Sequence, residues 1–228
     1  LLVGGLNPSG ERTRVDGYAA AGVEALAMEW MPRITRAQSM DILSSQSNLS
    51  GYKAVLDAAS EYGKAFPMMM TAAGTVAPAK VFIMGVGVAG LQAIATARRL
   101  GAVVTATDVR PATKEQVESL GAKFLAVEDE EFRNAQTAGG YALELTPEQV
   151  DKQRQAQKDI IAKSDVVITT AQVFGRKPPV LVTRDMVEGM APGSVIVDMA
   201  AETGGNCELT RPGETFESGG VAMRALGR

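Results

Sequence analysis

The chain has 228 residues, of which 46% are hydrophobic and 21% charged, and its formal net charge is -3. This is the composition of a globular protein, and it excludes disorder over the whole chain. The acidic balance argues against a general nucleic-acid binder. There is no histidine and Cys207 is the single cysteine, so this sequence excludes histidine-based catalysis, an intrachain disulfide and a cysteine-cluster metal site.

The start of the chain has the pattern of a strand. It lies in an apolar run, Leu1 to Val3, with no basic segment before it, which is unlike a signal peptide. The uncharged stretch over 81–97 is shorter than the ~20 apolar residues that a membrane helix needs, so we expect no direct membrane insertion. Residues 1–66 are predicted to be part of an incomplete first α/β domain with a linking helix.

Within this N-terminal region, residues 4–17 are rich in turn residues and predict a loop, and residues 23–29 predict a short buried strand. A helix is predicted over 47–66, and Pro67 ends it. Its apolar face is predicted from residues that recur at spacings of three and four, namely Leu49, Tyr52, Val55, Leu56 and Ala59. A connector of small residues then runs over 71–78.

From residue 80 onward, strand and helix patterns alternate. The predicted strands are 80–84, 102–107, 123–127, 165–170 and 194–198. The predicted helices are 88–100, 112–120 and 147–163, and glycines follow the first two. This alternation predicts an α/β fold in which residues 67–228 form a Rossmann-type, doubly wound parallel sheet covered on both faces.

The motif with the clearest chemistry is Gly85-Val-Gly87-Val-Ala-Gly90, which follows a predicted strand and opens a predicted helix. In a dinucleotide-binding turn, Gly85 permits the tight turn, Gly87 lets the backbone approach a pyrophosphate, and Gly90 allows close packing of helix on strand. The N–H groups at the helix start then face the phosphates. The alternative is an ordinary strand–turn–helix connection with no ligand.

Asp108 ends the next predicted strand, 18 residues after Gly90, near the ~20 expected for the acid that binds the adenosine ribose. A carboxylate there accepts hydrogen bonds from the ribose hydroxyls and repels a 2′-phosphate, which favours NAD(H) over NADP(H). Arg110 argues in the other direction, because a nearby arginine accommodates a 2′-phosphate. The alternative for Asp108 is a cap on a turn at the strand end.

A second polar cluster lies in the segment 32–44. It contains Arg33, Gln38, Asp41 and Ser44, whose donors and acceptors suit a carboxamide and a ribose. From spacing alone, a solvated loop that caps the following helix is the favoured interpretation of this segment.

Together these segments resemble the NAD(H)-binding component of the proton-translocating nicotinamide nucleotide transhydrogenases. The resemblance runs from about Ala25 to about Val221. Its motifs are Pro32 to Leu49, Gly51-Tyr52, Thr71 to Gly74, Gly85 to Arg98, Ala106 to Arg110, Lys114 to Gly121, Gly139 to Ala142, Thr169 to Ala171 and Gly204 to Cys207. The alanine dehydrogenases share the fold, and the loop over 33–41 favours the transhydrogenases.

The resemblance implies a set of site residues at the nicotinamide end of NAD(H). Arg33 and Asp41 are expected at the carboxamide and nearby ribose, and Ser44 is expected to support the carboxamide. Gln38 is expected to reach toward NADP(H) bound on a partner component.

Other cofactor contacts are implied further along the chain. Val88 is expected against the pyrophosphate, and the loop at Gly140 and Tyr141 is expected to close over bound nucleotide. Further contacts are implied along the adenosine ribose and the rest of the cofactor, by Asp108, Val109, Arg110, Gln153, Thr170, Ala171 and Gln172.

For function, the resemblance implies direct, Re/Si-specific hydride transfer between NAD(H) and NADP(H), coupled to proton translocation, with no catalytic or metal-binding residue from this chain. It also implies a homodimer, NADP(H)-binding and membrane-spanning partner components, and a place on the cytoplasmic face of the inner membrane. Two other functions stay open: an alanine dehydrogenase-like oxidoreductase, and a non-catalytic NAD-binding module.

The sequence departs from the family pattern in two places. Residues 172–175 read Gln-Val-Phe-Gly where the family commonly has a Leu-Ile-Pro-Gly type of run. Residues 223–228 do not match the expected continuation, and we expect the C-terminal segment that returns to the first domain to be absent.

Overall fold

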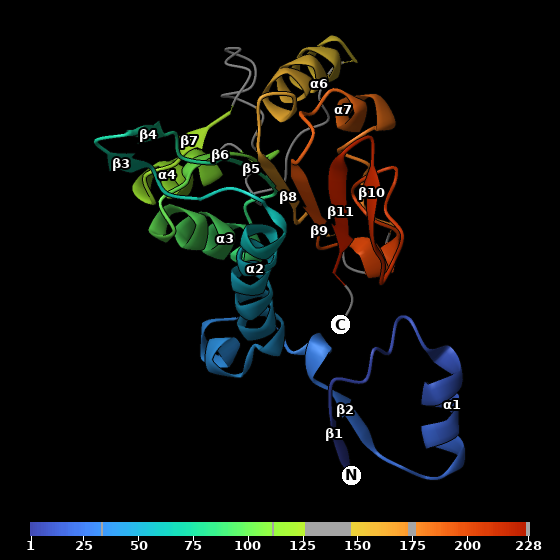
Figure 1. Ribbon diagram of the computed structural model, residues 1–228. Coiled ribbons are helices and arrows are strands. Elements are labelled where there is room, and N and C mark those ends of the chain that lie inside the picture. Colours follow the sequence, from blue (N-terminus) through green and yellow to red (C-terminus); the bar gives the residue numbers. More distant parts are fainter. Residues whose placement is uncertain (33, 111, 126–146, 173–176, 227–228) are drawn as a thin grey trace.

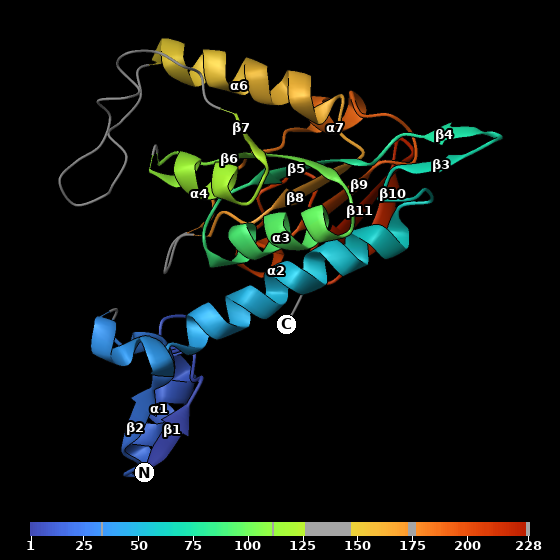
Figure 2. The ribbon, with the colours of Figure 1, turned by 90° about the vertical axis from the view of Figure 1, so that its left-hand side faces the viewer.

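The computed structural model describes residues 1–32, 34–110, 112–125, 147–172 and 177–226, with backbone alone for residues 147–150. The N-terminal region stands apart from the main body of the molecule (Figures 1 and 2). In it, β1 (Leu2–Gly4) and β2 (Ala25–Ala27) pair in parallel, and α1 (Arg12–Ala20) lies between them in the chain.

The predictions for this N-terminal region are only partly confirmed. The expected loop over 4–17 is wrong from Arg12 onward, because α1 forms there with an Arg12–Asp16 ion pair of 2.8 Å one turn apart. The strand within 23–29 is confirmed in place, but its expected burial is wrong. Ala25 and Leu26 are exposed because, within the described residues, only β1 pairs with this strand.

Two short 3₁₀ helices, η1 (Met28–Trp30) and η2 (Thr35–Met40), lead into the long helix α2 (Ile42–Glu61). The helix starts and ends five residues earlier than predicted. Its expected apolar face is only partly confirmed: Val55 is buried and Leu56 and Ala59 are partly buried, but Leu49 and Tyr52 are exposed. The buried face holds mainly small residues, Gly51, Ala54, Val55, Asp57 and Ala58.

Small residues are required on that face because α2 packs very closely on α3 (Val88–Arg99). A Cβ atom added at Gly51 would lie 2.1 Å from the carbonyl oxygen of Ala89. The Asn48 side chain donates to Gln92 Oε1 at 3.0 Å across the same contact. The close approach of the two backbones selects the residues on this face.

The segment after α2 is also more ordered than a simple connector. β3 (Met69–Thr71) and β4 (Gly74–Val76) form an antiparallel hairpin. The hairpin projects from the main body (Figure 2).

The main sheet has seven strands in the order β10-β11-β9-β8-β5-β6-β7. Their bounds are β5 (Lys80–Met84), β6 (Val103–Thr107), β7 (Lys123–Phe124), β8 (Val166–Thr169), β9 (Val195–Asp198), β10 (Thr215–Ser218) and β11 (Val221–Ala225). All neighbours pair in parallel except β10 with β11. The predicted Rossmann-type α/β fold is confirmed, and the antiparallel edge strand β10 is an addition to it.

Helices cover both faces of this sheet (Figure 2). One face packs against α2, α3 and α4 (Thr113–Ser119), and its core includes Val55, Ile83 and Ile94. The other face packs beneath α6 (Pro147–Ile161) and α7 (Arg184–Glu188), around Phe82 and Ile196. Neighbouring residues of one strand therefore enter opposite cores, as alternating side chains require.

The strand order reverses direction between β5 and β8. From β5 the chain adds β6 and β7 on one side, and it then returns to add β8 and β9 on the other. In such sheets, ligands bind outside the carboxyl ends of the strands at this switch point. The ends of β5 and β8 are thus the place where the fold predicts a site.

Within the ranges described, no helix combines the length and apolar character needed to cross a membrane.

Candidate functional site

The turn after β5 has the geometry that its glycines predict. Gly85 has φ +103°, a conformation that side chains rarely adopt. Gly90 sits against the strand end, where an added Cβ would lie 1.9 Å from the carbonyl oxygen of Gly85. Gly87 differs from both, because an added Cβ there would meet no atom of the protein within 4 Å.

Helix α3 begins at this turn, and no side chain accepts a hydrogen bond from its first N–H groups. Gly87 is the N-cap and supplies no side chain, and the first helical bond runs from the Leu91 N–H to the Gly87 carbonyl oxygen at 2.9 Å. The N–H groups of Val88, Ala89 and Gly90 precede the first internal hydrogen bond of the helix. Unpaired N–H groups at a helix start attract anions, and there is open space beside them at Gly87.

Asp108, just after β6, is tied directly to this turn. The Val86 N–H donates to its Oδ2 at 2.7 Å, and the Gly85 N–H donates to the Thr107 carbonyl oxygen at 2.9 Å. The Arg110 side chain lies on the same carboxylate, with Nε 2.9 Å from Oδ1 and Nη2 3.0 Å from Oδ2. The structure thus brings together Gly85, Asp108 and Arg110 as the sequence predicts.

These contacts set the charge of the pair. Burial acts to raise the pKa of Asp108, but hydrogen bonds from the Arg110 side chain and the Val86 N–H outweigh it, so the pKa lies below its ordinary value. The hydrogen bond to Asp108 raises the pKa of Arg110. Both groups are therefore charged at neutral pH.

The end of β8 lies beside the glycine turn. The Thr170 hydroxyl donates to the Gly85 carbonyl oxygen at 3.0 Å, and the Thr170 N–H donates to the Met84 carbonyl oxygen at 2.9 Å. Gln172 turns its side chain away to the Met199 carbonyl oxygen, 2.9 Å from Nε2. Thr170 and Ala171 are thus at the switch point, and Gln172 points to the loop after β9.

Asp198 and Asn206 support this strand end, and neither is among the site residues predicted from the sequence. Asp198 is 1% exposed and accepts from Thr169 Oγ1, from the Thr210 hydroxyl and from three backbone N–H groups. Asn206 Nδ2 donates to the carbonyl oxygens of Ala171 and Pro179 at 2.9 and 2.8 Å. The signal for them was the position of Asp198 at a strand end and the motif Gly204-Gly-Asn-Cys207.

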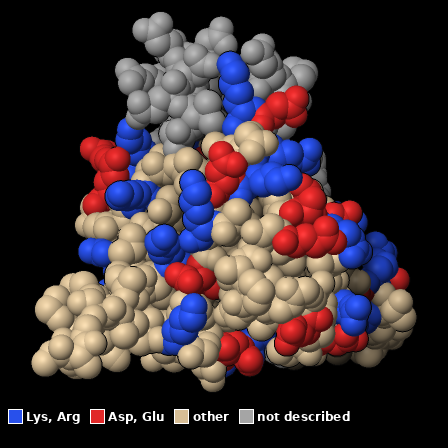
Figure 3. Space-filling view, turned by 45° about the horizontal axis from the view of Figure 1, so that its top comes forward, with Lys and Arg blue, Asp and Glu red and all other residues tan. Residues whose placement is uncertain are grey.

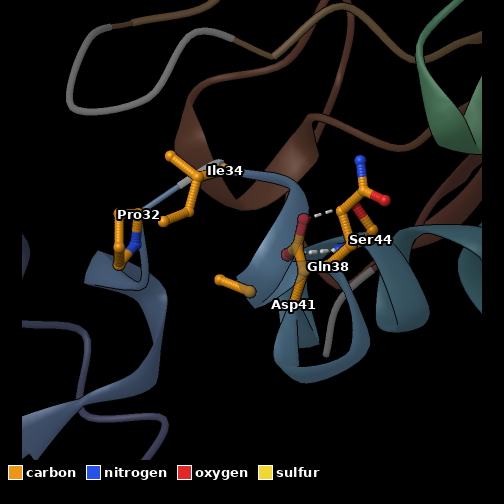
Figure 4. Close-up of a pocket in the computed structure, with 6 residues that line it drawn as sticks. Pro32, Ile34, Gln38, Asp41 and Ser44 are labelled. Atoms are coloured by element: carbon orange, nitrogen blue, oxygen red, sulfur yellow. Dashed lines mark hydrogen bonds between the residues drawn. The ribbon is translucent and has the colours of Figure 1, made fainter.

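A pocket of about 410 Å³ lies between η2 and the start of α2 (Figure 4). It is lined by Pro32, Ile34, Ala37, Gln38, Asp41 and Ser44. Three of these, Gln38, Asp41 and Ser44, are site residues predicted from the sequence. Mixed apolar and polar lining of this kind suits a small ring with an amide.

Helix α2 fixes how far this pocket lies from the glycine turn. Gly51 of α2 touches Ala89, the second residue of α3, and the pocket lies at the start of α2, nine residues earlier. At 1.5 Å per residue that is roughly 14 Å. A small ring site and a phosphate-binding turn are thus connected by one rigid helix.

Asp41 caps α2, as the alternative sequence interpretation expects. Its Oδ1 accepts from the Ser44 N–H at 3.0 Å, and its Oδ2 accepts from the Ser44 hydroxyl at 2.7 Å. Figure 4 shows the two bonds as dashed lines. Capping and ligand binding do not exclude each other for this carboxylate.

We expect Asp41→Ala to lower the free energy of unfolding by about 1 kcal/mol, because the start of α2 loses its side-chain acceptor. Asp41→Asn keeps an acceptor and is the matched control, with a loss of less than half of that. Chemical denaturation of the three proteins measures the difference. Equal stability of wild type and Asp41→Ala would show that the cap contributes nothing.

The remaining predicted site residues are more scattered. Val88 and Val109 are exposed near the turn, at 39% and 57%. Gln153 is half-buried on α6. Arg33, Gly140 and Tyr141 lie outside the described residues. Figure 3 shows basic and acidic side chains interspersed on the face of the molecule seen there.

Comparison with known proteins agrees with the fold. Residues 54–226 match the family described as "Alanine dehydrogenase/PNT, C-terminal domain". An NAD(P) transhydrogenase subunit alpha protein of Rhodospirillum rubrum is 61% identical over 212 residues, which are 93% of this chain and 55% of that protein. The chain therefore spans about half the length of the curated relatives it matches.

Two solved structures are similar over almost the whole chain. A transhydrogenase from Sinorhizobium meliloti has a TM-score of 0.87 and 57% identity, covering 98% of this chain and 60% of that one. An L-alanine dehydrogenase has a TM-score of 0.78 and 25% identity, covering 99% of this chain and 58% of that one.

Proposed function

This chain belongs to the alanine dehydrogenase/PNT family, and from that premise we propose that it is the NAD(H)-binding part of a proton-translocating NAD(P) transhydrogenase. The observation that carries the proposal is the glycine turn at the switch point, with Asp108 hydrogen-bonded to it. The 61% identity to a transhydrogenase alpha-subunit protein supports the same function over an alanine dehydrogenase.

The residues present fit a dinucleotide. Open space at Gly87 leaves room for a pyrophosphate, and the N–H groups of Val88 and Ala89 would bind it. Asp108 would hold the adenosine ribose, with Val109 and Arg110 beside it. Thr170 and Ala171 would line the middle of the crevice, and Gln153 and the loop at Gly140 and Tyr141 complete the proposed set.

At the other end, the pocket at the start of α2 would hold the nicotinamide. Asp41 and Ser44 offer carboxylate and hydroxyl groups, and Arg33 is assigned to the same end. Gln38 is exposed, and we assign it to the face that meets NADP(H) on the partner. When bound, NAD(H) supplies the hydride chemistry, and the chain's own residues orient the ring and exclude water.

The wider assembly belongs to the same proposal. The chain would act with NADP(H)-binding and membrane-spanning components at the cytoplasmic face of the inner membrane, coupling Re/Si-specific hydride transfer to proton translocation. It would form a homodimer, which sedimentation of the purified chain measures. The division into residues 1–66 and 67–228 likewise stays a prediction.

Hydride exchange with a partner tests the activity. We expect NADH oxidation coupled to reduction of an NADP⁺ analogue when this chain is mixed with NADP(H)-binding and membrane components. No such reaction is expected when this chain or those components are omitted. Tight NADH binding without exchange in the full mixture would instead support a non-catalytic NAD-binding module.

The alanine dehydrogenase alternative has one observation in its favour, the TM-score of 0.78 to an L-alanine dehydrogenase. That activity would oxidise NADH only in the presence of pyruvate and ammonia. NADH oxidation that depends on those two substrates, with no need for NADP⁺, would favour the alternative.

Cofactor selectivity is expected to depend on Asp108. Asp108→Ala removes the acceptor for the ribose hydroxyls and the charge that repels a 2′-phosphate, so NADH affinity is expected to fall about tenfold or more while NADPH affinity rises. Asp159→Ala, on the exposed face of α6, is the control. Calorimetric titration of both variants measures the ratio of NADH affinity to NADPH affinity. A ratio unchanged from that of the wild type in Asp108→Ala would remove Asp108 from the proposed site.

A further inference from the structure

The carboxylate of Asp108 is already fully engaged by the protein. Its Oδ1 accepts from the Arg110 N–H and Nε, both at 2.9 Å. Its Oδ2 accepts from the Val86 N–H at 2.7 Å and from Arg110 Nη2 at 3.0 Å. A carboxylate offers about four acceptor positions, so none is left for a ribose hydroxyl.

The four donors differ in how easily they leave. Two are backbone N–H groups, fixed in the glycine turn and in the turn after β6. The other two belong to one guanidinium, which takes one position on each carboxylate oxygen. The Arg110 side chain is 43% exposed, whereas that of Asp108 is 7% exposed. The guanidinium is therefore the group that can leave toward solvent.

The guanidinium and a ribose diol require the same acceptor positions on the Asp108 carboxylate. A vicinal diol presents two O–H donors, which need one acceptor position on each oxygen of the carboxylate. These are the positions that Nε and Nη2 occupy. Nη2 also donates to the Val86 carbonyl oxygen at 3.2 Å, which holds the guanidinium over the turn.

We propose that Arg110 is a built-in competitor for the adenosine ribose, and that its guanidinium must swing off Asp108 before a nucleotide binds. This inference rests on the proposed NAD(H) site. It reverses the role that the family resemblance implies for Arg110, because the side chain opposes NADH binding in place of aiding it. The apparent affinity of the wild type is then the intrinsic affinity multiplied by the fraction of molecules in which the arginine has left the carboxylate.

The test is the affinity of Arg110→Ala for NADH, measured by calorimetric titration of the full chain. We expect this variant to bind NADH about fivefold more tightly than the wild type, the size of effect typical of a part-exposed ion pair. The melting temperature of the ligand-free variant is expected to fall, because Asp108 loses its charged partner. Arg99→Ala, an exposed arginine at the end of α3, is the matched control with wild-type affinity.

The outcomes separate the inference from the proposed function. Unchanged or weaker NADH binding by Arg110→Ala, with normal binding by the wild type, overturns the inference alone. No NADH binding by the wild type overturns the proposed function and the inference with it. Arg110→Gln keeps the first three carbons of the side chain and removes the guanidinium and its charge, so it gives the same comparison if the alanine variant does not fold.

Discussion

Alanine at position 90 is expected to lower the free energy of unfolding by about 3 kcal/mol or more, because its Cβ would be forced against backbone. The added atom would lie 1.9 Å from the Gly85 carbonyl oxygen and 2.9 Å from its carbonyl carbon. Neither is the end of a flexible side chain, so α3 must move away from the end of β5. Thermal and chemical denaturation measure the loss.

Gly87→Ala is the matched control in the same turn. Its Cβ would meet no protein atom within 4 Å, and its φ of -81° is one that alanine adopts freely. We expect stability within about 0.5 kcal/mol of the wild type. The same variant is expected to bind NADH at least tenfold more weakly, because the methyl group occupies the space proposed for the pyrophosphate. Equal stability of Gly87→Ala and Gly90→Ala would contradict the packing account.

Asp198→Ala is expected to have the second large effect, a loss of about 3–5 kcal/mol. The carboxylate is 1% exposed, and its removal leaves the N–H groups of Ala200, Asn206 and Cys207 without their acceptor. Each buried donor left unpaired costs about 1–3 kcal/mol. Denaturation curves of the variant and the wild type measure the difference.

Two further variants test whether the lost hydrogen bonds cause the fall in stability. Asp198→Asn keeps the shape but turns an NH₂ group toward donors, so it is expected to recover only part of the loss. Asp159→Ala removes an exposed acid that accepts from Gln155 at 2.9 Å, and is expected to change stability by less than about 0.5 kcal/mol. A small loss in Asp198→Ala would mean that the network is not needed to hold the strand end.

The sequence predicts the region from β5 to α4 well because its signals are local. The strand over 80–84 is confirmed to the residue, and the helix after it ends one residue earlier than predicted. Gly101 and Gly121 have positive φ values of +90° and +77° where they end helices. Apolar runs and glycines at turns require no knowledge of distant residues.

The failures come from contacts between distant segments. The face of α2 was predicted from its large apolar residues, yet the approach of Ala89 requires small residues there and leaves Leu49 and Tyr52 exposed. The β3–β4 hairpin and the antiparallel strand β10 depend on strand pairing, which the periodicity of one segment does not contain.

The candidate site likewise combines features with local sequence signals and features that depend on contacts between distant segments. Spacing identifies Asp108 and the glycine turn, and the structure brings them within hydrogen-bonding distance. The hydrogen bonds from the Arg110 guanidinium to Asp108 depend on a side-chain conformation, which the sequence does not predict. The support from Asn206 likewise depends on two loops that meet only in the folded chain.

Calorimetric titration of this chain with NADH and, separately, with NADPH decides whether the crevice at the ends of β5 and β8 is an NAD(H) site. We predict saturable binding of NADH with one site per chain, and weaker binding of NADPH, because Asp108 is charged and faces the glycine turn. Absence of NADH binding, or tighter binding of NADPH, would contradict the claim that this crevice is an NAD(H) site.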